Sequence, residues 1–498
     1  MTEFELKFEI PPACLKGVAT AMLEGRAGRQ RLQARYFDTA DDALAMQGIV
    51  VRLRKEGRRW VQTAKGPTAD LLERLEHNVP LVSQPAATVP VVDLLLHRGT
   101  AVGKAIERAL GIDDEIFPDL ILKYSTDVQR FTRLTSCLGS TVEVSLDQGR
   151  VFLDGHSQSI CELEVELKKG VPAHAVVLAR EWCSKHGLWL SSISKSMKGQ
   201  RLRSAEPFGA ALTAVAPKYA HRASGEEITT AVVQSCLNQI LVNASEVAGS
   251  SYQADHVHQL RVGIRRLRTA LRELGCLTTG IDPAWEAVLV DVFRSLGRYR
   301  DHSHLALFLQ PQLLEAGGPV VCFTEVDGGI DDPGATVRDS NFQDVLLGLI
   351  GFLQREVHGK AHNKAATSQT LKKTLSLRLE KLHTGALRDG KKFLVLDEVQ
   401  QHRVRKRLKR LRYLMEFAAP LFSARKVHQM TVALKPAQDA MGLYNDELMA
   451  LLAWRALANS NPDAWFGVGW FAARRLPNAR RCLKDIKSFA DLKPFWRK

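Results

Sequence analysis

Residues 2–10 read TEFELKFEI, an unbroken alternation of polar and apolar side chains. Successive side chains of a β-strand point to opposite faces, so Glu3, Glu5 and Lys7 would share one face and the apolar residues between them the other. This stretch therefore predicts a strand with one apolar face and one face that carries two acids and a base.

The same alternation recurs through the first 200 residues and decides the class of fold. We expect further strands at residues 49–55, 60–65, 72–79, 141–146 and 161–167, and helices at 13–23, 91–110 and 173–186. On a single strand, a charged face is as typical of the wet side of a sheet as of an interior. Because five strands repeat the pattern, we interpret these faces as the lumen of a closed or nearly closed antiparallel barrel, with the apolar faces packed under an outer layer.

Such a lumen has a defined chemistry. Acids and bases buried together are costly to desolvate unless they pair or a ligand neutralises them. Clustered carboxylates are the ligands that Mg²⁺ and Mn²⁺ prefer, and clustered Arg and Lys side chains bind phosphate oxygens. Both sets in one cavity indicate a metal-bridged oligophosphate.

A set of short motifs in this half resembles one known family. The segment Glu3-Phe4-Glu5-Leu6-Lys7 is similar to the ExExK motif of the CYTH superfamily, the triphosphate tunnel metalloenzymes. The segments that follow in the family's order are YFDT at 36–39, VRLR at 51–54, QTAK at 62–65, ERLE at 73–76, VEVSLD at 142–147, CELE at 161–164 and SISK at 192–195. The resemblance covers residues 1–203.

The resemblance implies a role for each charged lumen residue. The ligands of Mg²⁺ or Mn²⁺ would be Glu3, Glu5, Glu162 and Glu164. The phosphoryl chain would be held by Lys7, Arg52, Arg54, Lys65, Arg74, Arg130 and Lys195, with Arg133 as the alternative to Arg130. A second metal or the attacking water would be positioned by Glu76, Glu143 and Asp147, which with Lys7 and Lys195 make up the expected catalytic group. Glu166 is either a further lumen acid or structural.

The activity implied by the resemblance is hydrolysis of inorganic triphosphate to pyrophosphate and phosphate. Thiamine triphosphatases and class IV adenylyl cyclases belong to the same family. Their substrates need an aromatic or nucleoside pocket, and Trp60 is expected to face outward with Gln62 rather than inward with Lys65. A protein that binds polyphosphate or a nucleotide without turnover is the non-enzymatic alternative. The complete set of acids argues against it, because binding a polyanion needs only the bases.

The second half of the chain differs in charge and in periodicity. The net charge of the protein is +15, and residues 221–498 carry 40 Lys and Arg against 28 Asp and Glu. After an Ala-, Pro- and Gly-rich linker, nearly all of it has apolar residues at helical spacing. We therefore expect an α+β protein with an antiparallel β-barrel (tunnel) domain at 1–203, a linker at 204–219 and an all-α helical-bundle domain with an internal duplication at 220–498. The excess positive charge favours a polyanionic partner.

An internal repeat places basic side chains on two helices of this half. The segments HQLRVGIRRLR at 258–268 and HRVRKRLKRLR at 402–412 both begin with histidine and have basic residues at positions +3, +7 and +10, on one stripe of a helix. LGRYRD at 296–301 and MGLYND at 441–446 repeat in the same order. One basic stripe is commonly a solvated face. Two copies with few acids favour a bound polyanion, because like charges along a helix repel.

The repeats resemble the CHAD domain, a helical family named for its histidines, over residues 220–498. The resemblance implies a groove that binds inorganic polyphosphate through His258, Arg261, Arg265, Arg268, His402, Arg405, Lys409 and Arg412. The histidines could instead ligate a metal, but no acid or cysteine lies at coordination spacing, so hydrogen bonds to phosphate are favoured. Nucleic acid is disfavoured as a partner, because the basic helices lack an aromatic stacking series.

The remaining features concern the compartment. Eight cysteines without a CxxC pair favour a reducing environment. We find no basic-then-apolar leader and no apolar run near the ~20 residues that span a bilayer. We therefore expect a cytoplasmic protein without a membrane segment, associated with polyphosphate granules through its second half. The preferred metal and the oligomeric state are left open.

Overall fold

The computed structural model describes residues 2–24, 27–68, 71–81, 89–112, 117–321, 332–355 and 368–497. The chain forms two compact units. The first contains the residues up to Leu212, Ile240–His256 and a segment that begins at Val337. The second contains Thr213–Gln239, Val257–Thr336 and the C-terminal part of the chain. Helix α6 (Gly225–Ala248) therefore contributes to both units, and the linear boundaries at residues 204 and 220 stay a prediction.

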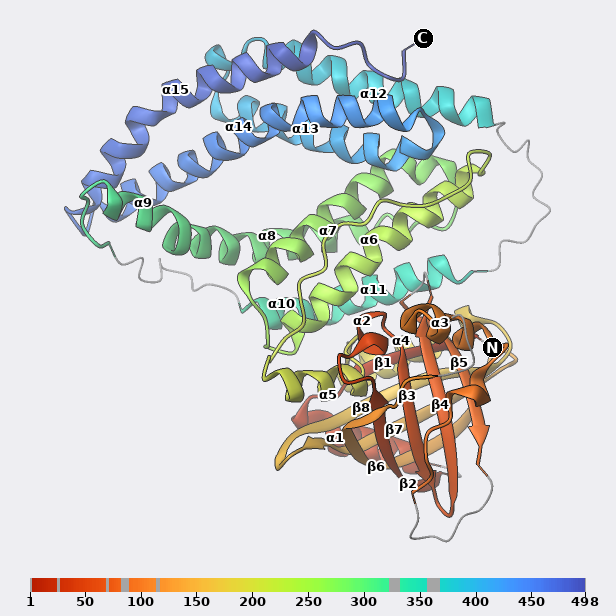
Figure 1. The fold of residues 1–498 in the computed structure, drawn as a ribbon. Coiled ribbons are helices and arrows are strands. Elements are labelled where there is room, and N and C mark those ends of the chain that lie inside the picture. The colour runs from red at the N-terminus through yellow and green to blue at the C-terminus, as the bar shows by residue number, and fades with distance from the viewer. Residues whose placement is uncertain are drawn as a thin grey trace. The chain divides into compact units, whose positions relative to one another are not determined.

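The first unit is built on a closed β-barrel (Figure 1). Its strands are β1 (Thr2–Glu9), β2 (Gly28–Asp38), β3 (Val50–Glu56), β4 (Arg59–Pro67), β5 (Glu73–Pro80), β6 (Ile121–Cys137), β7 (Ser140–Leu153) and β8 (His156–Lys169). They pair antiparallel in the order β5-β4-β3-β2-β6-β7-β8-β1, and pairing of β1 with β5 closes the barrel. The short strand β9 (Trp189–Leu190) pairs with the end of β1. The predicted antiparallel barrel is confirmed.

The apolar faces of the strands are buried under helices, as the alternation predicts. Leu6, Phe8 and Leu163 are fully buried, and burying such a side chain stabilises the fold by about 1.5–3 kcal/mol. Helix α4 (Pro172–His186) packs on β1, β6 and β8, and α3 (Ala101–Leu110) packs on β4 and β5. The other helical segments of this part are η1 (Pro12–Cys14), α1 (Leu15–Leu23), α2 (Ala43–Met46), η2 (Leu94–His97) and α5 (Lys195–Ser204).

One predicted element was wrong in extent. The sequence predicts a single helix over residues 91–110, but the structure has the short turn η2 followed by α3. Gly99 lies between them with a φ of 78°, a left-handed conformation that interrupts a helix. Thr100 then caps α3, because its side chain accepts a hydrogen bond from the Gly103 amide. Strands β2 and β6 were not predicted from the alternation.

The second unit is helical, as predicted. Its helices include α7 (Ala254–Leu274), α8 (Trp285–His304), α9 (Gln310–Glu315), α10 (Pro333–Arg338), α12 (Ser368–Gly390), α13 (Glu398–Ala418), α14 (Ala424–Leu457) and α15 (Ala464–Ala490). Helix α11 (Ser340–Leu353) belongs to the first unit and packs on α4. The two sequence repeats lie on matching helices, the first copy on α7 and α8 and the second on α13 and α14. In Figure 1 the helices α12–α15 are drawn in shades of cyan to blue, and α14 packs along α15.

Two findings bear on the expectations for the compartment. Among the described cysteines none forms a disulfide. A search of the described helices found none that is both long enough and apolar enough to cross a bilayer.

Candidate functional site

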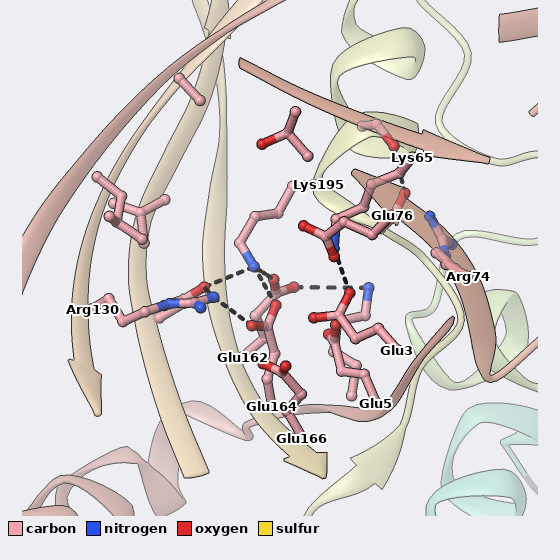
Figure 2. Close-up of a pocket in the computed structure, with 18 of the residues that line it drawn as sticks. Glu3, Glu5, Lys65, Arg74, Glu76, Arg130, Glu162, Glu164, Glu166 and Lys195 are labelled. Atoms are coloured by element: carbon pink, nitrogen blue, oxygen red, sulfur yellow. Dashed lines mark hydrogen bonds and ion pairs between the residues drawn. The ribbon is translucent and has the colours of Figure 1, made fainter. Parts of the chain in front are cut away.

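The barrel encloses a cavity of about 1240 Å³ that the charged strand faces line. Every residue predicted for the site in this half borders it: Glu3, Glu5, Lys7, Arg52, Arg54, Lys65, Arg74, Glu76, Arg130, Glu143, Asp147, Glu162, Glu164 and Lys195. Figure 2 shows most of these side chains converging from several strands. Glu166 also borders the cavity, whereas Arg133 does not and donates to the Ala21 carbonyl at 2.9 Å. Arg130 is therefore the arginine of this pair that faces the lumen.

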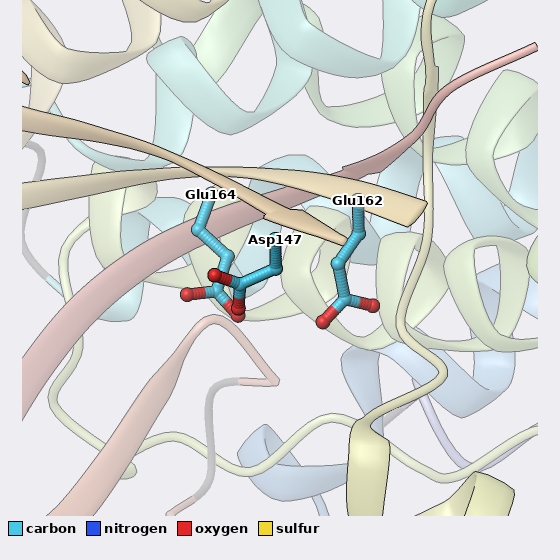
Figure 3. Close-up of side chains that lie close together, drawn as sticks. All are labelled: Asp147, Glu162 and Glu164. Atoms are coloured by element: carbon cyan, nitrogen blue, oxygen red, sulfur yellow. The ribbon is translucent and has the colours of Figure 1, made fainter. Parts of the chain in front are cut away.

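Strand register brings the acids of β7 and β8 together. Asp147 is the direct cross-strand partner of Glu162. Glu164 lies two residues further along β8 on the same face, opposite Lys7 of β1. One oxygen of each of Asp147, Glu162 and Glu164 lies within 4.8 Å of the others (Figure 3). We call these three residues the acid cluster.

Two cations make the closest contacts with the acid cluster. Arg130 is the cross-strand partner of Asp147 and donates to both of its carboxylate oxygens, at 2.7 and 2.6 Å. The Lys195 Nζ lies 2.7 Å from Asp147 and 2.6 Å from Glu164, and it also contacts Glu162. Burial alone would raise the pKa of Glu164, but Arg130 and Lys195 hold it well below its usual value. The same acids raise the pKa of Lys195 well above its usual value, against the effect of burial.

A second charged group lies on β1, β4 and β5. Lys65 and Glu76 are cross-strand partners, and the Lys65 Nζ lies 2.8 Å from both Glu76 and Glu3. Burial, followed by a hydrogen bond with Glu76, raises the pKa of Glu3 to about 9. The pKa of Glu76 is lowered, because the hydrogen bond from Glu3 and the charge of Lys65 outweigh burial. Glu3 is thus a neutral carboxyl group that donates to an ionised Glu76.

An amide chain fixes Glu76 in this arrangement. The Asn78 Nδ2 donates to Glu76 at 2.8 Å, and the Asn78 Oδ1 accepts a hydrogen bond from Thr63 at 2.7 Å. Thr63 is fully buried, so its hydroxyl determines which way the Asn78 amide faces. Glu76 is therefore held from two sides by donors, and both favour its ionised form.

Several described lumen charges have no hydrogen-bonded partner of opposite sign. Among the described residues, no carboxylate lies within ion-pair distance of Arg52 or Arg74, and no cation lies within that distance of Glu5. The Lys7 Nζ is buried without a hydrogen bond, and its nearest acid, Glu162, lies 3.9 Å away. Burial lowers the pKa of Lys7 and raises that of Glu5. These groups are the ones that a bound anion and a bound cation would satisfy.

The other predicted lumen residues pair with a charged residue on their own strand or on the adjacent one. Arg54 donates to Glu56 at 2.7 Å, and Glu143 lies 3.3 Å from the Lys168 Nζ. Glu56, Lys168 and Asn78 border the cavity but were not predicted. Each lies two residues from a predicted lumen residue on its strand, so the alternation itself contained this signal.

In the helical unit, the structure brings part of the predicted stripe together. Arg261 and Arg265 of α7 face Arg405 and Lys409 of α13, and Arg300 of α8 joins them; we call these five residues the basic cluster. Burial, followed by the charges of Arg265 and Arg405, lowers the pKa of Lys409 to about 6. Burial, with Arg265, Arg300 and Arg405, lowers the pKa of Arg261 to about 10.

The other residues of the predicted basic stripe contact residues outside the basic cluster or are exposed. Arg268 lies 2.8 Å from Glu286, and the Arg412 guanidinium lies 4.7 Å above the Tyr413 ring. His258 is exposed, and so is His402, which lies 3.2 Å from Asn445. No described group of three or more acids, histidines or cysteines with metal-ligand spacing includes either histidine.

Sequence reasoning missed the acid of the basic cluster. Asp446 of α14 lies 3.3 Å from Arg300 and 3.7 Å from His304. Its position in the second repeat matches that of Asp301 in the first. Both acids were visible in the repeat, but nothing in the helical periodicity indicated that they would face the cations of α7 and α13.

Comparison with known proteins now assigns the family. The CYTH domain model matches residues 1–199 and the CHAD domain model matches residues 231–455. The chain is a CYTH–CHAD protein. The two matches lie on either side of the linker predicted at 204–219.

Relatives of the CYTH–CHAD chain cover parts of it. It is 28% identical over 174 residues to the inorganic triphosphatase of Haemophilus influenzae, an alignment that covers 34% of this chain and 45% of that protein. The chain thus matches under half the length of that relative. The CHAD domain from Ricinus communis is 22% identical with a TM-score of 0.45, covering 57% of this chain and 98% of that one. A Hippeastrum protein described as a candidate adenylyl cyclase with a dominant triphosphatase activity is 15% identical with a TM-score of 0.29, covering 41% and 96%.

The lumen of the CYTH domain fits a divalent cation. The acid cluster offers three carboxylates with oxygens within 4.8 Å of one another, and Glu5 borders the same cavity with no described cation within ion-pair distance. An all-oxygen donor set of this kind suits a hard ion such as Mg²⁺ or Mn²⁺ and not a thiophilic metal.

Proposed function

We propose that the CYTH domain of this chain hydrolyses inorganic triphosphate to pyrophosphate and phosphate with Mg²⁺ or Mn²⁺. The observation that carries the proposal is the charge arrangement of the lumen. Cations without an ion-pair partner border the same cavity of the barrel as a cluster of carboxylates. The Haemophilus influenzae relative supports a triphosphatase-type activity for this domain.

The cations of the lumen bind the phosphoryl chain. Arg52 and Arg74 have no described acid within ion-pair distance, and Lys7 has no hydrogen bond to one. These side chains hold phosphate oxygens directly, because a buried guanidinium or ammonium needs an anion. Lys65, Arg130 and Lys195 are paired with acids, and they turn to the substrate when those acids bind a metal. Arg54, which pairs with Glu56, completes the predicted set.

The acids divide into two roles. Glu3, Glu5, Glu162 and Glu164 would hold the metal. When bound, the metal supplies Lewis-acid polarisation of the phosphates and neutralises their charge. Glu76 would position the attacking water or a second metal, because Lys65 and Asn78 keep this carboxylate ionised and fixed. Asp147 and Glu143 help to position the water or a second metal, and the arginines and lysines stabilise the charge on the leaving pyrophosphate.

The lining favours an inorganic substrate over an organic triphosphate. Among the described lining residues the aromatic side chains are Tyr36 and His77, and Tyr36 is stacked on Tyr124 with ring centroids 4.7 Å apart. Trp60 does not border the cavity, as predicted. Thiamine or a nucleoside would need a stacking surface that these residues do not offer.

For the CHAD domain we propose binding of inorganic polyphosphate at the basic cluster. The Arg405 Nε is buried without a hydrogen bond, and burial, followed by the neighbouring cations, lowers the pKa of Lys409. A polyanion supplies the missing counter-charge. The predicted residues Arg268, Arg412, His258 and His402 would extend this site along the helices. Cytoplasmic function and association with polyphosphate granules belong to this proposal.

The test is phosphate release from triphosphate, pyrophosphate, ATP, thiamine triphosphate and long-chain polyphosphate, with Mg²⁺ and Mn²⁺ compared. We expect triphosphate to be the preferred substrate. Turnover should be lost in Glu5→Gln, because the substitution removes a carboxylate that would hold the metal. Glu181→Gln, on the exposed surface of α4, is the matched control. Tight triphosphate binding without phosphate release in the wild type would favour the non-catalytic alternative, and a preference for thiamine triphosphate or cyclisation of ATP would favour the other family activities.

A further inference from the structure

A buried lysine behind the acid cluster has no place in the predicted site. Lys198 lies on α5, one turn after Lys195, and its side chain is only 6% exposed. Its Nζ lies 2.9 Å from Glu9 and 3.6 Å from Glu162. Lys198 does not border the cavity, so it acts on the site only through these two acids.

The position of α5 is tightly fixed, which fixes Lys198. The Ser194 side chain caps the helix by accepting a hydrogen bond from the Met197 amide. A Cβ on Gly199 would lie 2.2 Å from the Tyr124 ring, so this glycine lets the helix contact β6 directly. Residues three apart on a helix share a face, and Lys195 and Lys198 accordingly lie on either side of Glu162.

Glu162 therefore has three ammonium groups around one fully buried carboxylate: Lys195 in direct contact, Lys198 at 3.6 Å and Lys7 at 3.9 Å. The acid cluster as a whole has charge −3 and the cations that touch it, Arg130 and the three lysines, have charge +4. Glu9 restores the balance. It is the cross-strand partner of Glu162 on β1 and takes the closest contact with Lys198.

We propose that Lys198 is a positioning residue that acts through Glu162, and that the Glu9–Lys198 pair sets how strongly the acid cluster binds a divalent cation. This inference rests on the proposed metal-dependent function. The ammonium group of Lys198 opposes the charge of an incoming divalent ion. Glu9 draws this ammonium group away from Glu162 and so weakens the opposition.

The two partners should have opposite effects on metal binding. Replacing Lys198 by Met removes a positive charge beside Glu162, and Mn²⁺ should bind about tenfold more tightly. Replacing Glu9 by Gln removes the competing acid and adds a net positive charge, so Mn²⁺ should bind more weakly by a similar factor. The double variant keeps the wild-type charge and should bind Mn²⁺ within about threefold of wild type, because the two Coulomb effects cancel.

The experiment is Mn²⁺ binding to the full chain without substrate, followed by calorimetry and by the electron paramagnetic resonance signal of free Mn²⁺. Thermal unfolding of each variant shows that it is folded. Lys198→Arg keeps the charge and should keep the wild-type affinity. Arg203→Met, on the same helix but paired with Asp42, is the matched control and should leave Mn²⁺ binding unchanged.

The outcomes separate this inference from the proposed function. If Lys198→Met and Glu9→Gln both weaken Mn²⁺ binding, the pair is only a structural support and the inference is overturned. Unchanged binding in Lys198→Met would overturn it as well. Wild-type protein that shows no saturable Mn²⁺ binding would instead remove the metal site, and with it the proposed function.

Discussion

The shared proton of Glu3 and Glu76 makes the stability of the metal-free barrel depend on pH. The pKa of Glu3 is raised from 4.5 to about 9 in the folded protein. Between these values the folded state holds a proton that the unfolded chain has lost. The stabilising contribution of this proton is fully present below pH 4.5 and is lost as pH rises through about 9.

The magnitude follows from linkage. One additional bound proton changes the free energy of unfolding by about 1.4 kcal/mol per pH unit, so this group destabilises the barrel by about 3 kcal/mol between pH 6 and pH 8. Such a change lowers the melting temperature of a domain of this size by about 8 °C. Glu3→Gln carries a permanent neutral amide that still donates to Glu76, so this part of the pH dependence should vanish.

The assay is differential scanning calorimetry of wild-type, Glu3→Gln and Glu181→Gln protein in a metal chelator at pH 6 and pH 8. We expect the barrel transition of Glu3→Gln to move less with pH than those of the other two proteins. If the three transitions move in parallel, Glu3 does not hold the proton in the folded state. The lumen would then contain two ionised acids beside Lys65, and the assignment of Glu3 as a neutral donor to Glu76 would be wrong.

The remaining predictions concern the basic cluster. Arg261→Ala combined with Arg405→Ala should weaken polyphosphate binding about tenfold or more, because two buried charge-assisted contacts are lost. Triphosphate turnover should change little. Filter binding measures the first activity and phosphate release the second, and equal loss of both would show that the two activities are not independent. Asp446→Asn should tighten polyphosphate binding up to about fivefold, because a partly exposed ion pair with Arg300 is worth at most about 1 kcal/mol. The control is Asp439→Asn, which removes an exposed ion pair on the same helix. Weaker binding in Asp446→Asn would show instead that this acid orients Arg300 for the ligand.

Side-chain alternation predicted the barrel wherever its two faces differ in polarity. In β1 the contrast is complete, and period two alone places Glu3, Glu5 and Lys7 on one face; the repetition on other strands indicated that this face is the lumen. Strand β2 shows why other strands were missed: its buried positions include the small Ala34, and Arg31 on its other face pairs with Asp127 of β6. Where polar side chains occupy both faces, as in parts of β6, the sequence shows no alternation between polar and apolar residues, and the strand cannot be predicted from it.

Strand register and contacts between distant elements could not be predicted from the sequence. Alternation places Lys65 and Glu76 in the lumen, but only the pairing of β4 with β5 makes them direct neighbours. The same holds for Arg130 and Asp147 on β6 and β7. In the helical domain the stripe on each helix was predictable. That Arg300 would join the cations, while Arg268 would turn to Glu286, depends on how separate helices pack.

The two domains bury charge in opposite ways, and this difference implies different ligand requirements. In the barrel most cations are already paired with acids. A phosphate chain can therefore bind these cations only when a metal ion binds their acid partners instead. Metal and triphosphate should therefore bind with positive coupling. In the CHAD domain, Lys409 and Arg405 lie among other cations and form no ion pair with a described acid, although Asp446 is near. A bound anion therefore relieves repulsion without breaking an ion pair of these two residues. Polyphosphate should accordingly bind this domain without a metal and with a strong dependence on salt, because its affinity comes from unpaired charge.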